Sequence, residues 1–284
     1  MIIQRILAFA AKLCLLSVLG LETGLATEPL KVCAAANELP YSNRDKQGFE
    51  NRIAELIAAH LDRALEYVWW KDARYYIRDF LDKGDCDLVI GLDTDDPRVL
   101  TTEPYYRSGY VFVTQEKLEP EITAWDDPRL LRIKKIAFVP NTPAEVMIRA
   151  IGRYNDQFNY LHSLVNFKSR RNQHVRYDPA RLVDEVDSGN AEIAVLWAPA
   201  AARYVRSAHN RLSMTLIADD NVRADGEKVP HHYSTSFGVR KDDPALLAEL
   251  NEGLKALQPK IEEILREEGI PLVSESSERL AAKN

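Results

Sequence analysis

Short apolar runs with strand character alternate along the chain with stretches of helical periodicity. The runs expected to form strands lie at residues 30–35, 65–70, 87–92, 110–114, 135–139, 192–196, 214–218 and 235–239. Between many of them apolar positions recur every three or four residues, as Ile53, Ile57 and Leu61 do in FENRIAELIAAHL, which predicts an amphipathic helix. Strands that alternate with helices predict an α/β protein with parallel-rich sheets covered by helices on both faces.

Several helix ends are marked by capping residues. Asp178 and Asp243 each precede a proline, which predicts a capping aspartate with proline at the first helical position. Gly269, with a proline two residues later, is expected to end the last helix. In FVPNTPAEVMI the spacing of Thr142 and Glu145 predicts a capping box. Free amides at such a helix start are a natural anion site in an α/β sheet, although the box can also serve only to cap the helix.

The first 26 residues have the features of a secretory signal peptide. They combine two basic residues, an apolar run from Leu13 to Leu21, and the small residues Gly24 and Ala26. Cleavage is therefore expected after Ala26, and the mature protein is expected in the periplasm. The apolar run is too short to cross a bilayer, which needs ~20 residues, so no membrane span is expected.

Export changes the interpretation of the cysteines. Cys14 belongs to the signal, and Cys33 and Cys86 remain in an oxidising compartment where disulfides persist. Each lies at the start of an expected parallel strand. A Cys33–Cys86 disulfide is therefore plausible if the two strands are neighbours, and two separate buried thiols are the alternative.

Size and charge limit the possible functions further. About 258 residues remain after the signal, which exceeds the usual size of one core and favours two lobes. The chain carries 37 Lys and Arg against 43 Asp and Glu, a net charge of −6 at pH 7. Residues 165–179, VNFKSRRNQHVRYDP, are basic, but an acidic exported protein is a poor partner for nucleic acid.

The order of the motifs resembles that of periplasmic solute-binding proteins of the amino-acid-receptor type. The segments that carry this resemblance are LKVCAAANELPYSN, DLVIGL, KIAFVPNTPAE, GNAEIAVLWAPAAARYV and FGVRKDDPALLAELNEGLKAL. It implies the two-lobed type II solute-binding fold, with two crossover strands near 110–115 and 234–239 and a ligand cleft between the lobes. Residues 27–112 and 236–284 would form lobe 1, and residues 113–235 would form lobe 2.

Longer motifs resemble the MxaJ (MoxJ) family, the binding-protein-like accessory of bacterial methanol dehydrogenase gene clusters. They are GFENRIAELIAAHL, VLTTEPYYRSGYVFV, LHSLVNFKSRRNQHVRYDPARLVDEV, DGEKVPHHYSTSFGVRK and EGIPLV. The resemblance implies a periplasmic, non-catalytic protein without a cofactor, which assists maturation or activation of a methanol dehydrogenase that contains pyrroloquinoline quinone. The dehydrogenase, or its cytochrome c, would be the partner. A receptor that hands a polar solute to a permease is the alternative.

The cleft departs from the receptor pattern. In receptors of this fold an arginine binds the ligand carboxylate and an aspartate binds the ammonium group. Arg98 lies near the first position, behind a shorter and acidic turn, and the aspartate position falls on Trp197. An ammonium group without its charge partner is costly to bury, so an ordinary amino-acid receptor is not expected. The candidate cleft residues are Tyr41, Arg98, Thr142 and Trp197, in a cleft that either takes a different small anion at Thr142 or is vestigial.

Catalytic and metal-binding residues are not expected. Asp93, Asp95 and Asp96 lack the glycine and glutamate of an EF-hand loop and are expected in a solvated loop or cleft rim. The His231–His232 pair lacks a third spaced ligand. The remaining alternative is an enzyme on the same fold, as in periplasmic cyclohexadienyl dehydratases, for which Glu145 and Arg98 are the candidate acid and anion clamp.

Residues 153–173, RYNDQFNYLHSLVNFKSRRNQ, form an insertion relative to small receptors of this fold. Insertions on a complete scaffold often carry function, and aromatic residues with arginine are typical of interface hot spots. Tyr154, Phe158 and Tyr160 are expected to be exposed together with the candidate partner contacts Phe167, Lys168, Arg170 and Arg171. A solvated basic loop packed by its own aromatics is the alternative.

Overall fold

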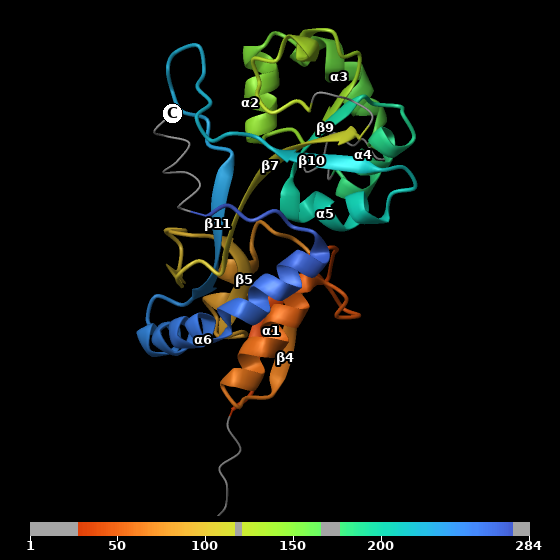
Figure 1. Ribbon diagram of the computed structural model, residues 1–284. Coiled ribbons are helices and arrows are strands. Elements are labelled where there is room, and N and C mark those ends of the chain that lie inside the picture. Colours follow the sequence, from red (N-terminus) through yellow and green to blue (C-terminus); the bar gives the residue numbers. More distant parts are fainter. Residues whose placement is uncertain (1–27, 117–120, 166–176, 275–284) are drawn as a thin grey trace, which may run out of the picture.

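The computed structural model describes residues 28–116, 121–165 and 177–274. Two lobes are stacked on each other, and two long strands run between them (Figure 1). Each lobe has a sheet with helices packed against it, as the alternation of apolar runs predicts. Within the described residues no helix is long and apolar enough to cross a membrane.

The first lobe is built around three parallel strands. β1 (Leu30–Ala35) lies between β4 (Leu65–Trp70) and β5 (Leu88–Asp93). Helices α1 (Phe49–His60) and α6 (Pro244–Glu268) pack on this sheet and on each other (Figure 1). Short strands β2 (Asn37–Glu38), β3 (Ser42–Asn43) and β6 (Leu100–Thr101) and a π-helical turn (Ile77–Leu81) complete the lobe.

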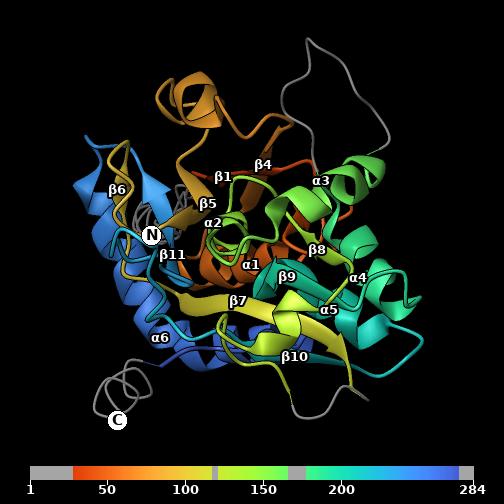
Figure 2. The same cartoon turned by 90° about the horizontal axis from the view of Figure 1, so that it is seen from above.

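The second lobe has its own sheet and its own apolar core. Its strands are β8 (Ile136–Phe138), β9 (Ile193–Trp197) and β10 (Leu212–Leu216), and its helices are α2 (Pro143–Ala150), α3 (Tyr154–Ser163), α4 (Pro179–Asp187) and α5 (Ala198–Ser207). A short 3-10 turn (Pro128–Leu131) precedes β8. Seen from above, β8, β9, β7 and β10 follow one another, with α3 and α4 at one side (Figure 2).

Strands β7 (Tyr106–Gln115) and β11 (His232–Val239) belong to both lobes. The first part of β7 pairs with β11, and its remainder pairs with β9 and β10. β11 continues into the first lobe, where it pairs with β5 and β6. The two crossover strands expected from the sequence are confirmed. The boundaries at residues 112 and 236 stay predictions, because both strands run through the junction.

The Cys33–Cys86 disulfide is confirmed. The two Cα atoms are 5.7 Å apart and the sulfur atoms are bonded at 2.04 Å. Both residues are fully buried, and Cys86 lies two residues before β5, the parallel neighbour of β1. The parallel pairing of β5 with β1 brings the segment before β5 close to β1, and thus Cys86 close to Cys33.

Most predicted helix ends are correct, and one is wrong. The Asp178 and Asp243 side chains accept hydrogen bonds from Ala180 N and Leu246 N, and Gly269 ends α6 with a φ of 80°. The capping box at α2 is not formed, because the Thr142 hydroxyl donates to Val139 O at 2.6 Å instead of capping the helix. The Thr142 hydroxyl is therefore used in the turn before the helix and does not cap the backbone N–H groups of α2.

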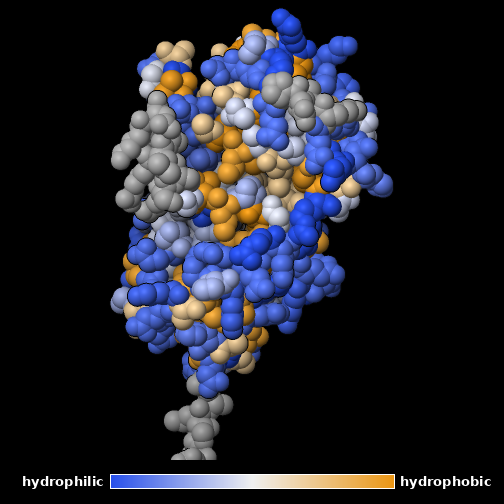
Figure 3. Space-filling view, viewed as in Figure 1, coloured by the Kyte–Doolittle hydropathy of each residue, from blue (hydrophilic) through white to orange (hydrophobic). Residues whose placement is uncertain are grey.

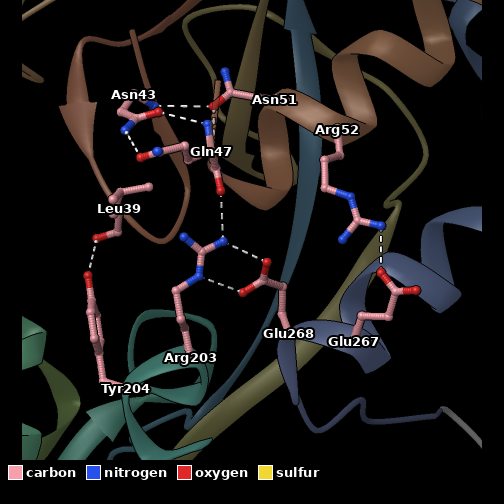
Figure 4. Close-up of polar contacts among 10 residues, drawn as sticks. Leu39, Asn43, Gln47, Asn51, Arg52, Arg203, Tyr204, Glu267 and Glu268 are labelled. Atoms are coloured by element: carbon pink, nitrogen blue, oxygen red, sulfur yellow. Dashed lines mark hydrogen bonds and ion pairs between the residues drawn. The ribbon is translucent and has the colours of Figure 1, made fainter. Parts of the chain in front are cut away.

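Polar contacts join the lobes at the side where α5 approaches α1 and α6 (Figure 4). Arg203 of α5 donates to both carboxylate oxygens of Glu268, at 2.6 and 2.9 Å, and to Gln47 O at 2.9 Å. Tyr204 donates to Leu39 O at 3.1 Å. Residues of the second lobe thus hold a loop and a helix end of the first lobe.

The aromatic residues of the insertion are only partly exposed. Phe158 is 54% exposed, as expected. Tyr154 and Tyr160 instead pack against the core of the second lobe, and the Tyr160 hydroxyl donates to Glu185 at 3.0 Å. The expectation of exposure was wrong for these two, because α3 lies on the lobe and turns both rings inward. The candidate partner contacts Phe167, Lys168, Arg170 and Arg171 lie outside the described residues.

Candidate ligand-binding cleft

A cavity of about 380 Å³ lies where the two lobes meet. Its walls come from strands of the first lobe, the start of α1, both crossover strands and the end of β9. The lining residues are Ala35, Glu38, Tyr41, Glu50, Trp70, Ala73, Tyr76, Ile90, Gly91, Asp93, Tyr106, Tyr110, Trp197, Tyr233 and Thr235. The volume is within the usual range for small-molecule sites.

The lining has an unusual charge pattern. It contains three carboxyl side chains, Glu38, Glu50 and Asp93, and no Lys, Arg or His from the described part of the chain. Seven of its residues are Tyr or Trp. The described lining therefore offers no cation to pair with a ligand carboxylate.

Glu50 is placed in the cavity by the periodicity of α1. It is three, four and seven residues before Ile53, Ala54 and Ile57, and therefore lies on the same buried face of the helix. Only 5% of Glu50 is exposed. Gly91 makes room for it, since a Cβ atom there would lie 2.4 Å from Glu50 Oε1.

The Glu50 carboxyl has little compensation for its burial. Its hydrogen-bond contact is with the Tyr105 hydroxyl, at 3.5 Å from Oε1. Burial and the nearby Glu38 raise the pKa of Glu50 to about 8, although the Tyr105 contact lowers it slightly. At neutral pH the Glu50 carboxyl is therefore mostly protonated.

Aromatic rings form the rest of the cavity wall. Tyr110, Trp197 and Tyr233, from three different strands, meet with ring centroids 5.7 to 6.3 Å apart and interplanar angles of 53° to 75°. On the first-lobe side Trp70 and Tyr76 stack at 4.8 Å. The Trp70 indole N–H is buried and has no hydrogen-bond partner within the described residues.

The tyrosines of the cavity stay neutral. Burial raises the pKa of Tyr41 and of Tyr106 well above the usual value, and the neighbouring carboxylate of Glu50 raises both further. Burial likewise raises the pKa of Tyr76 to about 12. The charge of the cavity is therefore set by its three carboxyl groups.

The structure brings together two of the four candidate cleft residues. Tyr41 and Trp197 line the cavity, whereas Arg98 is not among its lining residues. The Arg98 guanidinium instead binds both oxygens of Asp96, at 2.6 and 2.9 Å, and its side chain is 52% exposed. Arg98 is thus held by the acidic turn that precedes it. This is the turn that is expected from the sequence to be shorter and more acidic than the turn of receptors.

Thr142 lies in a neighbouring hollow of about 470 Å³ between α2 and the segment that precedes β11. Tyr233 lines both spaces. The start of α2 already has an internal anion, because Glu145 accepts a hydrogen bond from Asn141 N at 2.8 Å and pairs with Arg149 at 2.6 Å. This carboxylate opposes the binding of a second anion at Thr142.

Glu145 and Arg98, the pair considered for catalysis, contact different partners and do not contact each other. Glu145 is bound by Arg149 on its own helix, and Arg98 is bound by Asp96 in the first lobe. Neither residue lines the cavity that holds Glu50. The arrangement does not form a general acid next to an anion clamp.

The paired histidines have structural contacts. His231 is buried, its Nε2 accepts a hydrogen bond from the Trp125 indole at 3.0 Å, and its Nδ1 lies 2.8 Å from Val229 O. Burial lowers the pKa of His231, and its neutral form fits both contacts. His232 Nε2 lies 2.9 Å from Ile217 O. Across the residues that the structure describes, no cluster of three or more His, Cys, Asp or Glu side chains is placed to hold a metal ion.

Most cavity residues were not identified from the sequence. Glu50 was detectable, because it falls on the apolar face of FENRIAEL, three and seven residues before Ile53 and Ile57, where a glutamate is unusual. Asp93 was placed in a solvated loop or cleft rim, and it lines the cavity. Tyr110 and Tyr233 could not be recognised as cavity residues from the sequence, because tyrosines in strands are common in protein cores. Their proximity depends on how β7 pairs with β11.

Two α/β lobes, two crossover strands and a cavity at their junction define a solute-binding protein of the extracellular, two-lobed class. The family model for bacterial extracellular solute-binding proteins, family 3, matches residues 30–267. Protein MoxJ of Methylorubrum extorquens is 49% identical over 249 residues, which cover 87% of this chain and 83% of that protein. The chain therefore belongs to family 3 of the bacterial extracellular solute-binding proteins and, within it, to the MoxJ family.

Solved structures agree with this assignment. The crystal structure of MxaJ from Methlophaga aminisulfidivorans MPT is 48% identical, with a TM-score of 0.81 over 86% of this chain and all of that chain. The periplasmic binding protein XoxJ from Methylobacterium extorquens is 26% identical, with a TM-score of 0.65 over 87% of this chain and all of that chain. The resemblance and the fold expected from the sequence are confirmed.

Proposed function

We propose that this protein is exported to the periplasm and serves as an accessory of the methanol oxidation system. It would assist maturation or activation of a methanol dehydrogenase that contains pyrroloquinoline quinone, through protein–protein contact and without catalysis of its own. The similarity to Protein MoxJ over 87% of the chain carries this proposal, since membership of that family implies an accessory role for methanol dehydrogenase.

The cleft supports a role other than amino-acid reception. Trp197 occupies the position where receptors bind the ammonium group, and the cavity offers no cation from the described residues for a ligand carboxylate. A zwitterion would leave its carboxylate buried without a partner, which is costly. The two-lobed scaffold is therefore proposed to serve another purpose here.

The test uses the purified dehydrogenase of the same organism and the mature protein. Association is measured by biolayer interferometry at low and at physiological ionic strength, with and without the cytochrome c. In parallel, the apo-dehydrogenase is reconstituted with quinone and calcium in the presence or absence of the protein. Binding together with a faster or more complete gain of dehydrogenase activity is expected, and the absence of both effects would overturn the proposal.

The basic insertion is the proposed contact surface. Phe158, which is exposed, and Phe167 would anchor the dehydrogenase or its cytochrome, and Lys168, Arg170 and Arg171 would steer an acidic surface toward it. Such steering is screened over ~8 Å at physiological ionic strength. The double variant Arg170→Glu with Arg171→Glu should weaken binding and flatten its salt dependence while the melting temperature stays nearly unchanged. Unaltered affinity at low salt would exclude this surface.

A receptor that delivers a small polar ligand to a permease is the second candidate. The cavity of about 380 Å³ at the lobe junction favours it. Deletion of the gene would then abolish uptake of the labelled ligand without lowering methanol dehydrogenase activity. The reverse pattern would support the accessory role.

A further inference from the structure

The junction cavity combines a buried acid with an absence of basic residues. Only 5% of Glu50 is exposed, and it lines the cavity together with Glu38 and Asp93. Burial and the nearby Asp96 raise the pKa of Asp93, and the positive charge of Arg98 opposes this shift. Glu50, the most deeply buried of the three, interacts with no basic group of the described residues, which favours a ligand that brings the positive charge.

The arrangement of the carboxyl groups does not suit a metal ion. Divalent cations need several oxygen ligands that converge on one point. No set of three acidic, histidine or cysteine side chains in the described ranges converges in this way. The cation that fits is therefore larger than a bare metal ion and is contacted over a wider surface.

Aromatic rings supply that surface. Tyr110, Trp197 and Tyr233 meet at steep angles in the cavity wall, so the corner offers both faces and edges of rings to a ligand. Trp70 adds a stacked pair with Tyr76 on the other side and an indole N–H without a partner. Organic ammonium ions bind to such rings through cation–π attraction, and the indole N–H can donate to an oxygen of the ligand.

We propose that this cavity binds a small organic ammonium ion that carries no carboxylate. Glu50 serves as its counter-ion, and the rings of Tyr110, Trp197 and Tyr233 contact its alkyl groups. Because three of the contacts come from β7, β9 and β11, the ligand bridges the two lobes. This inference does not rest on the proposed role in methanol oxidation, and either can fail without the other.

Binding of such a cation is coupled to the proton on Glu50. The titratable groups that interact electrostatically with this carboxyl are Glu38, Tyr41, Tyr67, Tyr76, Tyr105 and Tyr106. None of them is basic, so nothing in this set holds Glu50 ionised before the ligand arrives. A cation that pairs with the ionised form displaces the proton.

The experiment compares three probes of similar shape by isothermal titration calorimetry with the mature protein. Choline carries a quaternary ammonium and a hydroxyl, 3,3-dimethyl-1-butanol is its neutral isostere, and glycine betaine adds a carboxylate. Choline is expected to bind at least about tenfold more tightly than either of the others. Methyl-, dimethyl-, trimethyl- and tetramethylammonium chloride are titrated as well, with sodium chloride as the reference for ionic strength.

Two variants and one control test the site. Glu50→Gln keeps the shape and removes the charge, so it should weaken choline binding at least about tenfold and leave binding of the neutral isostere unchanged. Asp93→Asn, at an exposed cleft position, should weaken choline binding by a smaller factor. Glu55→Gln is the matched control, because Glu55 lies on the exposed face of the same helix and should not change the affinity.

The pH dependence of choline binding distinguishes a counter-ion from a residue that only supports the structure. Choline affinity should rise about tenfold per pH unit as the pH approaches 8 from below, and binding at pH 7 should release about one proton, measured in buffers of different ionisation enthalpy. Glu50→Gln should abolish both effects. Failure of all the ammonium probes to bind, or equal affinity for choline and its neutral isostere, would overturn the proposal.

Discussion

At the scale of single residues, Glu50 links stability to pH. Its pKa is raised by burial to about 8 in the folded protein and returns to its ordinary value of about 4.3 in the unfolded chain. Between these values the folded state holds a proton that the unfolded state has lost. The stabilising contribution is therefore complete below the unfolded pKa and is lost as the pH rises through the folded pKa.

The variant Glu50→Gln isolates this effect. Relative to it, the wild-type melting temperature should fall as the pH increases from about 5 to about 8, because ionisation leaves an uncompensated buried charge. Thermal unfolding of both proteins at matched ionic strength gives the difference directly. A difference that does not change across this pH window would show that the carboxyl is ionised or solvated throughout.

Trp197 leads to a second prediction at the residue scale. None of the twenty standard amino acids should stabilise the protein, because Trp197 lines the cavity and the described lining has no cation for a ligand carboxylate. A ligand at a hundredfold excess over its Kd stabilises the folded state by about 2.7 kcal/mol, which thermal-shift screening detects easily. A reproducible shift of several degrees with any amino acid would restore the transport interpretation.

At the scale of elements, the apolar pattern predicted most of the fold. The runs at 30–35 and 65–70 coincide with β1 and β4, and the run at 110–114 lies inside the longer β7. The extra residues of β7 at its start pair with β11, a contact between distant parts of the chain that has no local signal. Strands β2, β3 and β6 were missed because two residues are too short for any periodicity.

The candidate site was predicted less well than the elements, for the same physical reason. Tyr41 and Trp197 were named by their place in the family pattern and do line the cavity. The acidic and aromatic character of the cavity arises from Glu50, Tyr110 and Tyr233, which are far apart in the chain. Their meeting depends on the register of β7 with β9 and β11, which the sequence does not specify locally.

The disulfide is the covalent link between β1 and the start of β5. It closes a loop with a sequence separation of 53 residues, so its removal should lower the free energy of unfolding by roughly 4 kcal/mol in the chain-entropy model. The double variant Cys33→Ser with Cys86→Ser is compared with the wild type in urea unfolding. The oxidised mature protein should also show no free thiol when titrated in denaturant, and two reactive thiols would contradict the bond.

At the scale of the whole molecule, the relation between the lobes decides whether the cavity exists. The crossover strands alone are a flexible connection in two-lobed proteins, since closure around a hinge changes a few backbone angles. Apolar side chains also gather in the middle of the face shown in Figure 3, over β7 where the lobes meet, while hydrophilic residues cover both outer parts. Ala202 of α5 belongs to the apolar core cluster of the first lobe, and Trp197 and Met214 pack against that cluster, so the lobes are joined by apolar contacts as well as by the strands.

The ion pair of Arg203 with Glu268 adds a polar connection that can be tested. The two side chains are only 26% and 10% exposed, and Arg203 also holds Gln47 O of the first lobe. The variant Arg203→Met leaves the Glu268 carboxylate buried without its partner. We expect a loss of roughly 1–3 kcal/mol, below the range for fully buried pairs because Arg203 is partly solvated.

Hydrogen exchange and a matched control separate this effect from general destabilisation. Arg52→Met removes the neighbouring Arg52–Glu267 pair, whose side chains are 40% and 54% exposed, and exposed pairs contribute little. In Arg203→Met the amides near Gln47 and the end of α6 should exchange faster, whereas Arg52→Met should behave like the wild type. Adding Glu268→Gln to Arg203→Met removes the unpaired charge and should recover part of the lost stability. Equal effects of the two arginine variants, or no recovery, would show that the lobes keep their orientation without this ion pair.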